Sequence, residues 1–193
     1  MKKKKLILAV TGCLLISILT IGGTLAWLTD QEQVKNVATI GNVNIEINEE
    51  WEPEDGLNIV PDVDITKKPS VKNIGANPAY IRAKVVFSDS YYNDYVELDY
   101  NLNDTNGQWF RNGDYYYYNQ IVIPGESTTP LFTQFKLSSN YIEPPIGVNP
   151  GFDIDVYAEA IQSQGFEPSE NTEASFASAI LDAFRNYMQP ATP

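Results

Sequence analysis

The segment 152–162 carries the carboxylates whose spacing comes closest to a catalytic arrangement. Asp153, Asp155 and Glu159 stand at odd positions of an alternating stretch, and every second side chain of a strand lies on the same face. We therefore expect them on one solvated face without a partner base. The chain contains no histidine, the commonest general base and metal ligand. This argues against a zinc protease or a Ser-His-Asp hydrolase, and we expect no enzyme, catalytic residue, metal site or cofactor; a carboxylate enzyme is the least favoured reading.

Residues 99–107, with the sequence DYNLNDTNG, place oxygen ligands at alternating positions, as a calcium loop does. A calcium loop needs a glycine at its tight turn and a bidentate glutamate at its end. Asp104 and Phe110 occupy those two positions here. A solvated acidic loop is therefore favoured over a calcium site.

Two other groups of side chains have both a structural and a chemical interpretation. Lys72 or Lys84 could form an isopeptide bond with an Asn or Asp beside Glu159, but lysines that protect a strand edge are commoner. The four tyrosines at 115–118 could form an adhesive or sugar-stacking surface, but alternating tyrosines also fill both faces of a sheet. Packing is the favoured role of the tyrosines.

The N-terminus has the pattern of a cleavable signal peptide. Four lysines at 2–5 precede an apolar run from Leu6 to Ile21, which two glycines and Thr24-Leu25-Ala26 follow. Charged, apolar and small-residue regions in this order predict export and cleavage between Ala26 and Trp27. An uncleaved anchor is the alternative, but the apolar run falls short of the roughly 20 residues that a membrane span needs. A lipid-attachment site at Cys13 is less favoured, because the apolar run continues beyond it.

Removing residues 1–26 leaves nine basic and 25 acidic side chains, a net charge of −16. Nucleic acid and anionic membranes are poor partners for such a chain, so we expect membrane contact only through the uncleaved signal peptide. The single cysteine lies in the signal peptide, so the mature chain forms no disulfide. Its 167 residues suffice for one domain.

Period-two patterns predict an all-β body. Residues 43–47, 81–87 and 152–160 alternate apolar and polar side chains, as half-buried strands do. Residues 63–71 read as an extended stretch in which Pro69 indicates an edge or a bulge, and "TPLFTQFKL" supplies a further strand. About seven or eight short strands fit a jelly-roll-type β-sandwich.

Other segments depart from simple alternation. Residues 88–107 lack periodicity and are expected to form a surface excursion. Asn112-Gly113 predicts a hairpin turn with positive φ at both residues. Apolar residues from Phe176 to Met188 recur at helical spacing, which predicts an amphipathic helix over 172–188, with Asn171 or Thr172 as its cap and Glu173 in the first turn.

Three segments resemble the TasA and camelysin family of exported matrix proteins: "GGTLAWLTDQEQVKNVATIGNVNIEI", "VKNIGANPAYIRAKVVF" and "VYAEAIQSQGF". They cover about 54 residues. The resemblance implies a jelly-roll fold, cleavage by a dedicated SipW-type signal peptidase and polymerisation into fibres of the biofilm matrix or cell surface. Camelysin's reported metalloprotease activity does not carry over, because the chain has neither histidine nor an HExxH motif.

In such fibres the freed N-terminal segment of one subunit joins the sheet of the next, a form of β-augmentation. The resemblance divides the chain into a signal peptide (1–26), a donor-strand segment (27–42), a β-sandwich (43–170) and a C-terminal helix and tail (171–193). The expected partners are further copies of the chain in a head-to-tail homopolymer, the signal peptidase and an accessory matrix protein. A monomeric surface adhesin for polysaccharide or a host ligand is the alternative function. The expected polymerisation strand comprises Trp27, Leu28, Val34, Val37 and Ile40.

Overall fold

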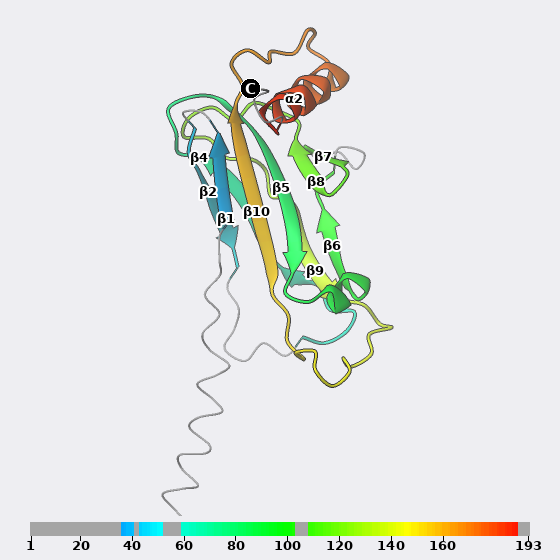
Figure 1. Ribbon diagram of the computed structural model, residues 1–193. Coiled ribbons are helices and arrows are strands. Elements are labelled where there is room, and N and C mark those ends of the chain that lie inside the picture. Colours follow the sequence, from blue (N-terminus) through cyan, green and yellow to red (C-terminus); the bar gives the residue numbers. More distant parts are fainter. Residues whose placement is uncertain (1–35, 41–42, 52–58, 103–107, 189–193) are drawn as a thin grey trace, which may run out of the picture. The chain divides into compact units, whose positions relative to one another are not determined.

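The computed structural model describes residues 36–40, 43–51, 59–102 and 108–188. Within these residues the chain is all-β, with one short 3-10 helix and one C-terminal α-helix (Figure 1). The elements are β1 (Asn36–Ile40), β2 (Ile45–Glu50), β3 (Ile65–Thr66), β4 (Lys68–Asn73), β5 (Ala79–Phe87), the 3-10 helix η1 (Ser90–Asp94), β6 (Val96–Tyr100), β7 (Trp109–Asn112), β8 (Tyr115–Tyr118), β9 (Phe132–Leu137), β10 (Ile154–Gln162) and α2 (Glu173–Met188).

The strands form three hydrogen-bonded sheets. Five strands lie in the order β1-β10-β5-β8-β7, two in the order β2-β4 and three in the order β3-β9-β6. The long strands β10 and β5 pair antiparallel over nine residues, from Ile154 opposite Phe87 to Gln162 opposite Ala79. Backbone bonds from residues 125–133 to β4 connect the two smaller sheets.

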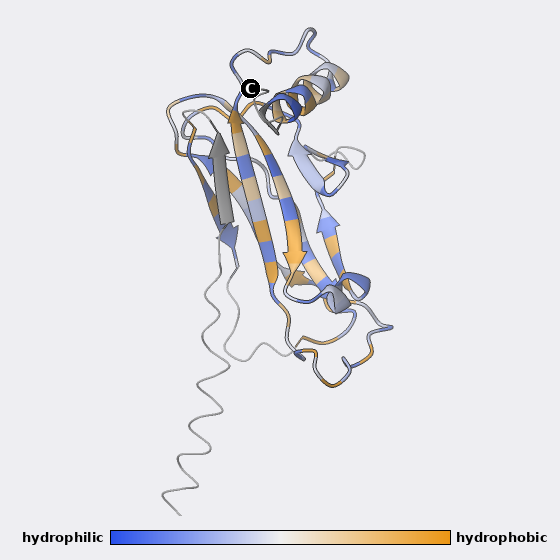
Figure 2. Ribbon diagram, in the orientation of Figure 1, coloured by the Kyte–Doolittle hydropathy of each residue, from blue (hydrophilic) through white to orange (hydrophobic). Residues whose placement is uncertain are grey.

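The core lies between these sheets, and the predicted alternation is confirmed. Val43, Ile45 and Ile47 are buried, as are Val156, Ala158 and Ala160 of β10. These six residues belong to one apolar cluster with β4, β5 and Trp109 of β7. Figure 2 shows the corresponding alternation of hydrophobic and hydrophilic bands along β10 and β5.

Pro69 lies in an edge strand, as one of the two expectations had it, because β4 is an outer strand of the two-stranded β2-β4 sheet; it does not form a bulge. It lies inside β4, opposite Glu49 of β2 in an unbroken register. The backbone groups of the odd-numbered residues of β4 point away from β2. On that side Leu131 N–H donates to the Pro69 carbonyl (2.8 Å) and Thr128 N–H donates to the Val71 carbonyl (2.9 Å). The missing N–H of proline therefore does not interrupt pairing with β2.

The predicted hairpin is confirmed, but its turn lies one residue later. Asn112 pairs with Tyr115, so Gly113 and Asp114 form the two-residue loop. Among the described non-glycine residues only Asp62 has positive φ, whereas Gly113 has φ of 64°. A glycine at the first loop position is typical of a type II′ turn, so positive φ at Asn112 is not needed.

The predicted surface excursion over 88–107 is wrong for its described part. This region contains η1 and β6, and both Tyr92 and Val96 are buried. Asp89 caps η1 by accepting a hydrogen bond from Tyr91 N–H (2.8 Å). Tyrosine rings can pack in a core while their hydroxyls bind polar partners. The lack of an aliphatic period in this region therefore did not mean that the region is exposed.

The predicted C-terminal helix is confirmed, with Glu173 in its first turn. Thr172 caps it, since its hydroxyl accepts a hydrogen bond from Ser175 N–H (3.3 Å). Its buried residues, Ala179, Ile180, Ala183 and Phe184, form a second cluster with Tyr80, Tyr117 and Ile161. The helix therefore covers side chains of β5, β8 and β10 that face away from the main core.

Candidate functional site

The edge of the five-stranded sheet at β10 is occupied by β1. The two strands run parallel, from Asn36 opposite Tyr157 to Ile40 opposite Ile161, and they lie side by side in Figure 1. Val37 and Ile40 of the expected polymerisation strand therefore pair within the same chain. Trp27, Leu28 and Val34 lie outside the described residues, as does the expected cleavage site at Ala26.

The attachment of β1 is short compared with that of its neighbour. Five residue pairs join β1 to β10, whereas nine join β10 to β5. Parallel pairing is also slightly less stable per residue than antiparallel pairing. If β1 left, residues 157–161 of β10 would expose unpaired backbone donors and acceptors, which form a template for another strand.

A buried cation lies on the strand next to β10, on the face that α2 covers. Arg82 of β5 is only 4% exposed. Its Nε donates to Glu159 Oε2 (2.7 Å), and its guanidinium lies 4.0 Å from the Tyr115 ring centroid and 4.6 Å from that of Phe184. Burial opposes the charge, but hydrogen bonds to Tyr117 and Glu159 outweigh it and raise the pKa of Arg82.

The three carboxylates of segment 152–162 do not share a solvated face as expected. The Glu159 side chain is 26% exposed and is held by Arg82. Asp155 is half-buried; burial and Asp153 raise its pKa, while Lys67 acts in the opposite direction. The reason is that residues from other elements meet this face: Arg82 of β5 binds Glu159, the Phe184 ring of α2 lies over Arg82, and Lys67 lies near Asp155. Glu159 also accepts a hydrogen bond from the Tyr115 hydroxyl (3.3 Å), so its carboxylate is bound by two side chains of the same face.

Among the lysines that the structure describes, Lys67 is the buried one. The sequence analysis did not single it out. Its Nζ lies 2.7 Å from Glu49 Oε1, with both side chains below 10% exposure, and 5.1 Å from the Trp51 ring centroid. Lys84, a candidate for an isopeptide bond, is instead 39% exposed and faces Asp114 at 3.9 Å. The sequence did contain a clue to this burial. The odd-numbered residues of β4 are buried, and Lys67 occupies the next odd position before the strand.

The tyrosines of β8 pack as expected. Tyr116 and Tyr118 belong to the main core, while Tyr117 lies in the cluster under α2 with Tyr115 packed against it. Consecutive tyrosines thus fill opposite faces of the sheet, and this confirms the packing role. Most of the acidic loop 99–107 lies outside the described residues; Asp99 accepts a hydrogen bond from the Thr133 hydroxyl (2.8 Å).

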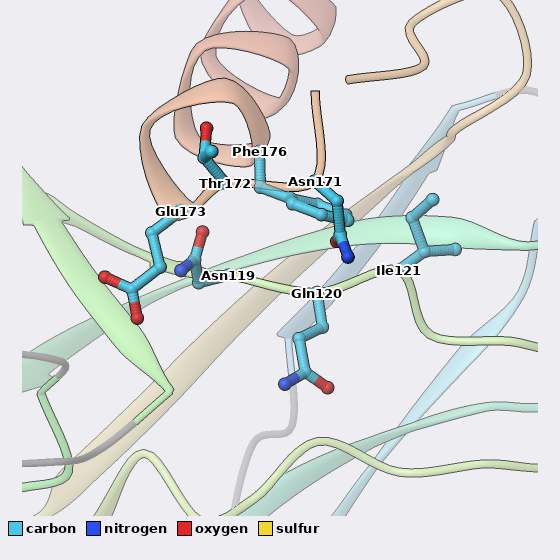
Figure 3. Close-up of a pocket in the computed structure, with 7 residues that line it drawn as sticks. All are labelled: Asn119, Gln120, Ile121, Asn171, Thr172, Glu173 and Phe176. Atoms are coloured by element: carbon cyan, nitrogen blue, oxygen red, sulfur yellow. The ribbon is translucent and has the colours of Figure 1, made fainter. Parts of the chain in front are cut away.

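An open hollow of about 470 Å³ lies beside the first turn of α2. Figure 3 shows the side chains that surround it, Asn119, Gln120, Ile121, Asn171, Thr172, Glu173 and Phe176. Asn119 Oδ1 is buried and has no hydrogen-bond partner among the described residues. Amide groups next to an aromatic ring are suited to neutral polar ligands such as sugars.

Among the described residues, no group of three or more His, Cys, Asp or Glu is arranged to hold a metal ion. No helix in the described part is long and apolar enough to cross a membrane. Comparison with known proteins found no matching family model, no matching curated protein and no matching solved structure.

Proposed function

We propose that this chain is a secreted structural subunit that polymerises into fibres of the extracellular matrix or cell surface. The observation that carries the proposal is the position of β1, a five-residue strand at the edge of a large sheet, next to the N-terminal segment. The same strand from another copy can replace β1 in the same register, because it offers the same backbone groups to β10. Release of the N-terminus by a SipW-type signal peptidase precedes assembly.

The fold proposed for the subunit is a jelly-roll-type β-sandwich. In support, β2, β4 and β9 form one backbone-bonded layer through the 125–133 segment. Side chains of that layer share the main core with β5 and β10 of the five-stranded sheet. In the strand order β1 is the outermost strand of the five-stranded sheet, so its exchange leaves the pairing of β10 with β5 in place.

Assembly proceeds by strand exchange at β10. In the free subunit β1 satisfies the backbone of Tyr157–Ile161 in cis. In a fibre, the segment 27–40 of one copy takes this place on the next copy, and the longer segment supplies additional pairing. The contact joins two different surfaces and does not close on itself, so it propagates into a filament. An accessory matrix protein with an open edge or a free strand could start or cap growth.

Cysteine crosslinking tests the exchange directly, because the mature chain contains no cysteine. Asn36 and Tyr157 are register partners, and adjacent strands bring Cα atoms within the roughly 4.4–6.8 Å range of disulfides. One batch of mature chain carries Asn36→Cys and a second carries Tyr157→Cys. Filaments grown from the mixture should contain a disulfide-linked dimer on a non-reducing gel.

The control mixture replaces Tyr157→Cys with Asn93→Cys, an exposed position on η1, and should give no dimer. Electron microscopy of the same samples reports whether filaments form. Filaments without the Asn36–Tyr157 crosslink would refute strand exchange at β10. A mature chain that stays monomeric at every concentration, pH and salt would refute the fibre itself.

A monomeric surface adhesin is the second candidate function, because the hollow of Figure 3 places the side-chain amides of Asn119, Gln120 and Asn171 around the Phe176 ring. If the chain is an adhesin, it should bind a neutral polysaccharide and should not form filaments. Glycan-array binding that is lost in Asn119→Ala, in a chain that does not polymerise, would favour it over the fibre.

A further inference from the structure

One amine in the described part of the chain is enclosed by the fold and takes no part in the proposed function. The side chains of Lys67 and Glu49 are only 6% and 9% exposed, and Lys67 Nζ lies 2.7 Å from Glu49 Oε1. The Trp51 ring centroid lies 5.1 Å from this amine, and the Phe135 ring packs on the Trp51 ring with centroids 5.7 Å apart. An amine and a carboxyl group therefore meet beside aromatic rings, largely out of contact with water.

The other ion pairs of the described residues differ from this one in burial or in chemistry. Lys68, Lys84 and Lys136 also pair with carboxylates, but each exposes between 35% and 39% of its side chain. Arg82 is buried beside Glu159, but a guanidinium stays protonated in proteins and does not act as a nucleophile. Within the part of the chain that the structure describes, only the first pair combines a primary amine with burial on both sides.

Burial makes the charged form of this pair costly. Two ions that leave water lose their hydration, and their mutual attraction often does not make up for the loss. When one proton passes from Lys67 Nζ to the carboxylate of Glu49, the ions become a neutral amine and a carboxylic acid, which need less solvation. An unprotonated lysine amine is a nucleophile, and a carboxylic acid can release its hydroxyl group as water. The neutral pair is therefore the state from which an amide forms.

The backbone holds the two groups in position. Lys67 N–H donates to the Thr133 carbonyl (3.2 Å), and Glu49 lies opposite Pro69 in the β2–β4 register. Lys67 Nζ lies 2.7 Å from Glu49 Oε1. The carbon that carries this oxygen is at most one C–O bond length, about 1.2 Å, farther away. Groups held this close react as if they were highly concentrated, because little entropy is lost in bringing them together.

A third carboxyl group lies near the pair. Asp155 of β10 is half-buried, and the charges of Lys67 and Glu49 both act on it. Burial and Asp153 raise the pKa of Asp155, and Glu49 adds to this effect. Lys67 acts in the opposite direction. A carboxyl group that takes up a proton readily at this place can carry one from an attacking nitrogen to a leaving oxygen.

We propose that Lys67 Nζ and the side-chain carboxyl group of Glu49 condense to an intramolecular isopeptide bond. The nitrogen attacks Glu49 Cδ and forms the new C–N bond, and one C–O bond of the carboxyl group breaks. One proton passes from Nζ to the carboxylate before the attack, and a second passes from the nitrogen through Asp155 to the departing hydroxyl group. The oxygen leaves as water, Asp155 returns to its starting form, and no oxidant or other reactant is consumed.

The bond fastens the strand that follows β1. β1 ends at Ile40 and β2 begins at Ile45, so only residues 41–44 separate the exchangeable strand from β2. β2 is itself an outer strand of its two-stranded sheet. A pull on β1 in a fibre reaches β2 through this short connection, and an amide to the residue before β4 prevents β2 from leaving. The bond forms in the free subunit, and only this mechanical role rests on the proposed fibre.

The intact mass of the purified mature chain in denaturant tests the bond. Condensation removes one water, so the measured mass should lie one water below the value calculated from the sequence. After digestion, a branched peptide should contain Glu49 and Lys67 joined through their side chains. Trypsin should not cut after Lys67, because its amine is acylated.

Lys67→Arg and Lys68→Arg form a matched pair of variants. Both keep a cation at the start of β4, but only the first removes the buried amine. Lys68→Arg should retain the loss of one water, whereas Lys67→Arg should have the full mass calculated from its sequence. A succinimide at Asp55-Gly56 would also lose one water, but it would persist in Lys67→Arg. Circular dichroism checks that both variants fold, and peptide mapping of the wild type needs neither of them.

Asp155→Asn tests the proton carrier. In chains made by cell-free translation, the fraction that has lost one water is followed over time. The variant should condense roughly 100-fold more slowly, while its circular dichroism spectrum stays that of the wild type. An unchanged rate would overturn the role of Asp155.

The remaining outcomes separate the bond from the fibre. A folded wild-type chain with the full calculated mass would overturn the bond. A water loss that persists in Lys67→Arg, or a branched peptide that joins Lys67 to Asp155, would overturn it as well. Filaments that carry the Asn36–Tyr157 crosslink would stand in each of these cases. A condensed chain that never forms filaments would support the bond and refute the fibre.

Discussion

Phe184→Ala should destabilise the subunit by detaching the apolar face of α2. The Phe184 side chain is 2% exposed, and its ring lies edge-on to Tyr117 with centroids 5.7 Å apart. Truncating a buried phenylalanine costs about 3–5 kcal/mol. Two aromatic rings pack on the Arg82 guanidinium, and the same change removes one of them. The Tyr115 ring, whose centroid lies 4.0 Å from the guanidinium carbon, remains. We expect the free energy of unfolding to fall by about 4 kcal/mol.

Urea unfolding followed by tryptophan fluorescence measures this loss. Phe184→Leu keeps most of the volume and should cost only about 1.5 kcal/mol or less, which gives a second value if the alanine variant does not fold. Ser178→Ala is the matched control, because Ser178 lies on the exposed face of α2; its effect should stay within about 0.5 kcal/mol.

The pattern across the three variants is what tests the packing of α2. A loss below about 1 kcal/mol for Phe184→Ala, against the 3–5 expected for a buried ring, would show that α2 is detached in solution. The helix would then be available for partner binding. An equal loss for Ser178→Ala would show that the destabilisation is not specific to the packed face of α2, because alanine is the better helix former of the two residues.

Three further predictions concern charge, pH and processing. Arg82→Leu leaves Glu159 partly buried without its cation, and urea unfolding should show a loss of about 3 kcal/mol, with Glu159→Gln costing less. Burial raises the pKa of Tyr92 to about 12, whereas an unfolded tyrosine titrates near 10. The contribution of Tyr92 to stability is therefore present below about pH 10 and is lost between about pH 10 and 12. Tyr92→Phe should reduce the decline of the urea midpoint over this range. Ala26→Asp should leave the precursor at the membrane, whereas N-terminal sequencing of secreted wild-type protein should begin at Trp27; a start at Met1 would contradict this.

The sequence alone was enough to predict the strands and the helix in which apolar side chains recur with one clear period. The strand at 43–47, the long β10 and the stripe of α2 could be read directly, because burial of one face imposes a period of two or 3.6 on the side chains. Gly113 similarly determined the hairpin, although the exact turn depended on which residues pair across it. These features depend on neighbours within a few residues, so one sequence suffices to find them.

Tertiary structure decided how distant segments meet. β1 takes the edge of β10, about 120 residues away in the sequence, and no local period specifies that partner. Lys67 is buried because Glu49 and Trp51 arrive from β2 and the residue that follows it. Arg82 stands on the polar side of the alternating stretch 81–87, yet β8, β10 and α2 together remove it from water. A charge becomes stable inside a protein only when its partners are positioned around it, and those partners come from the fold, not from the adjacent sequence.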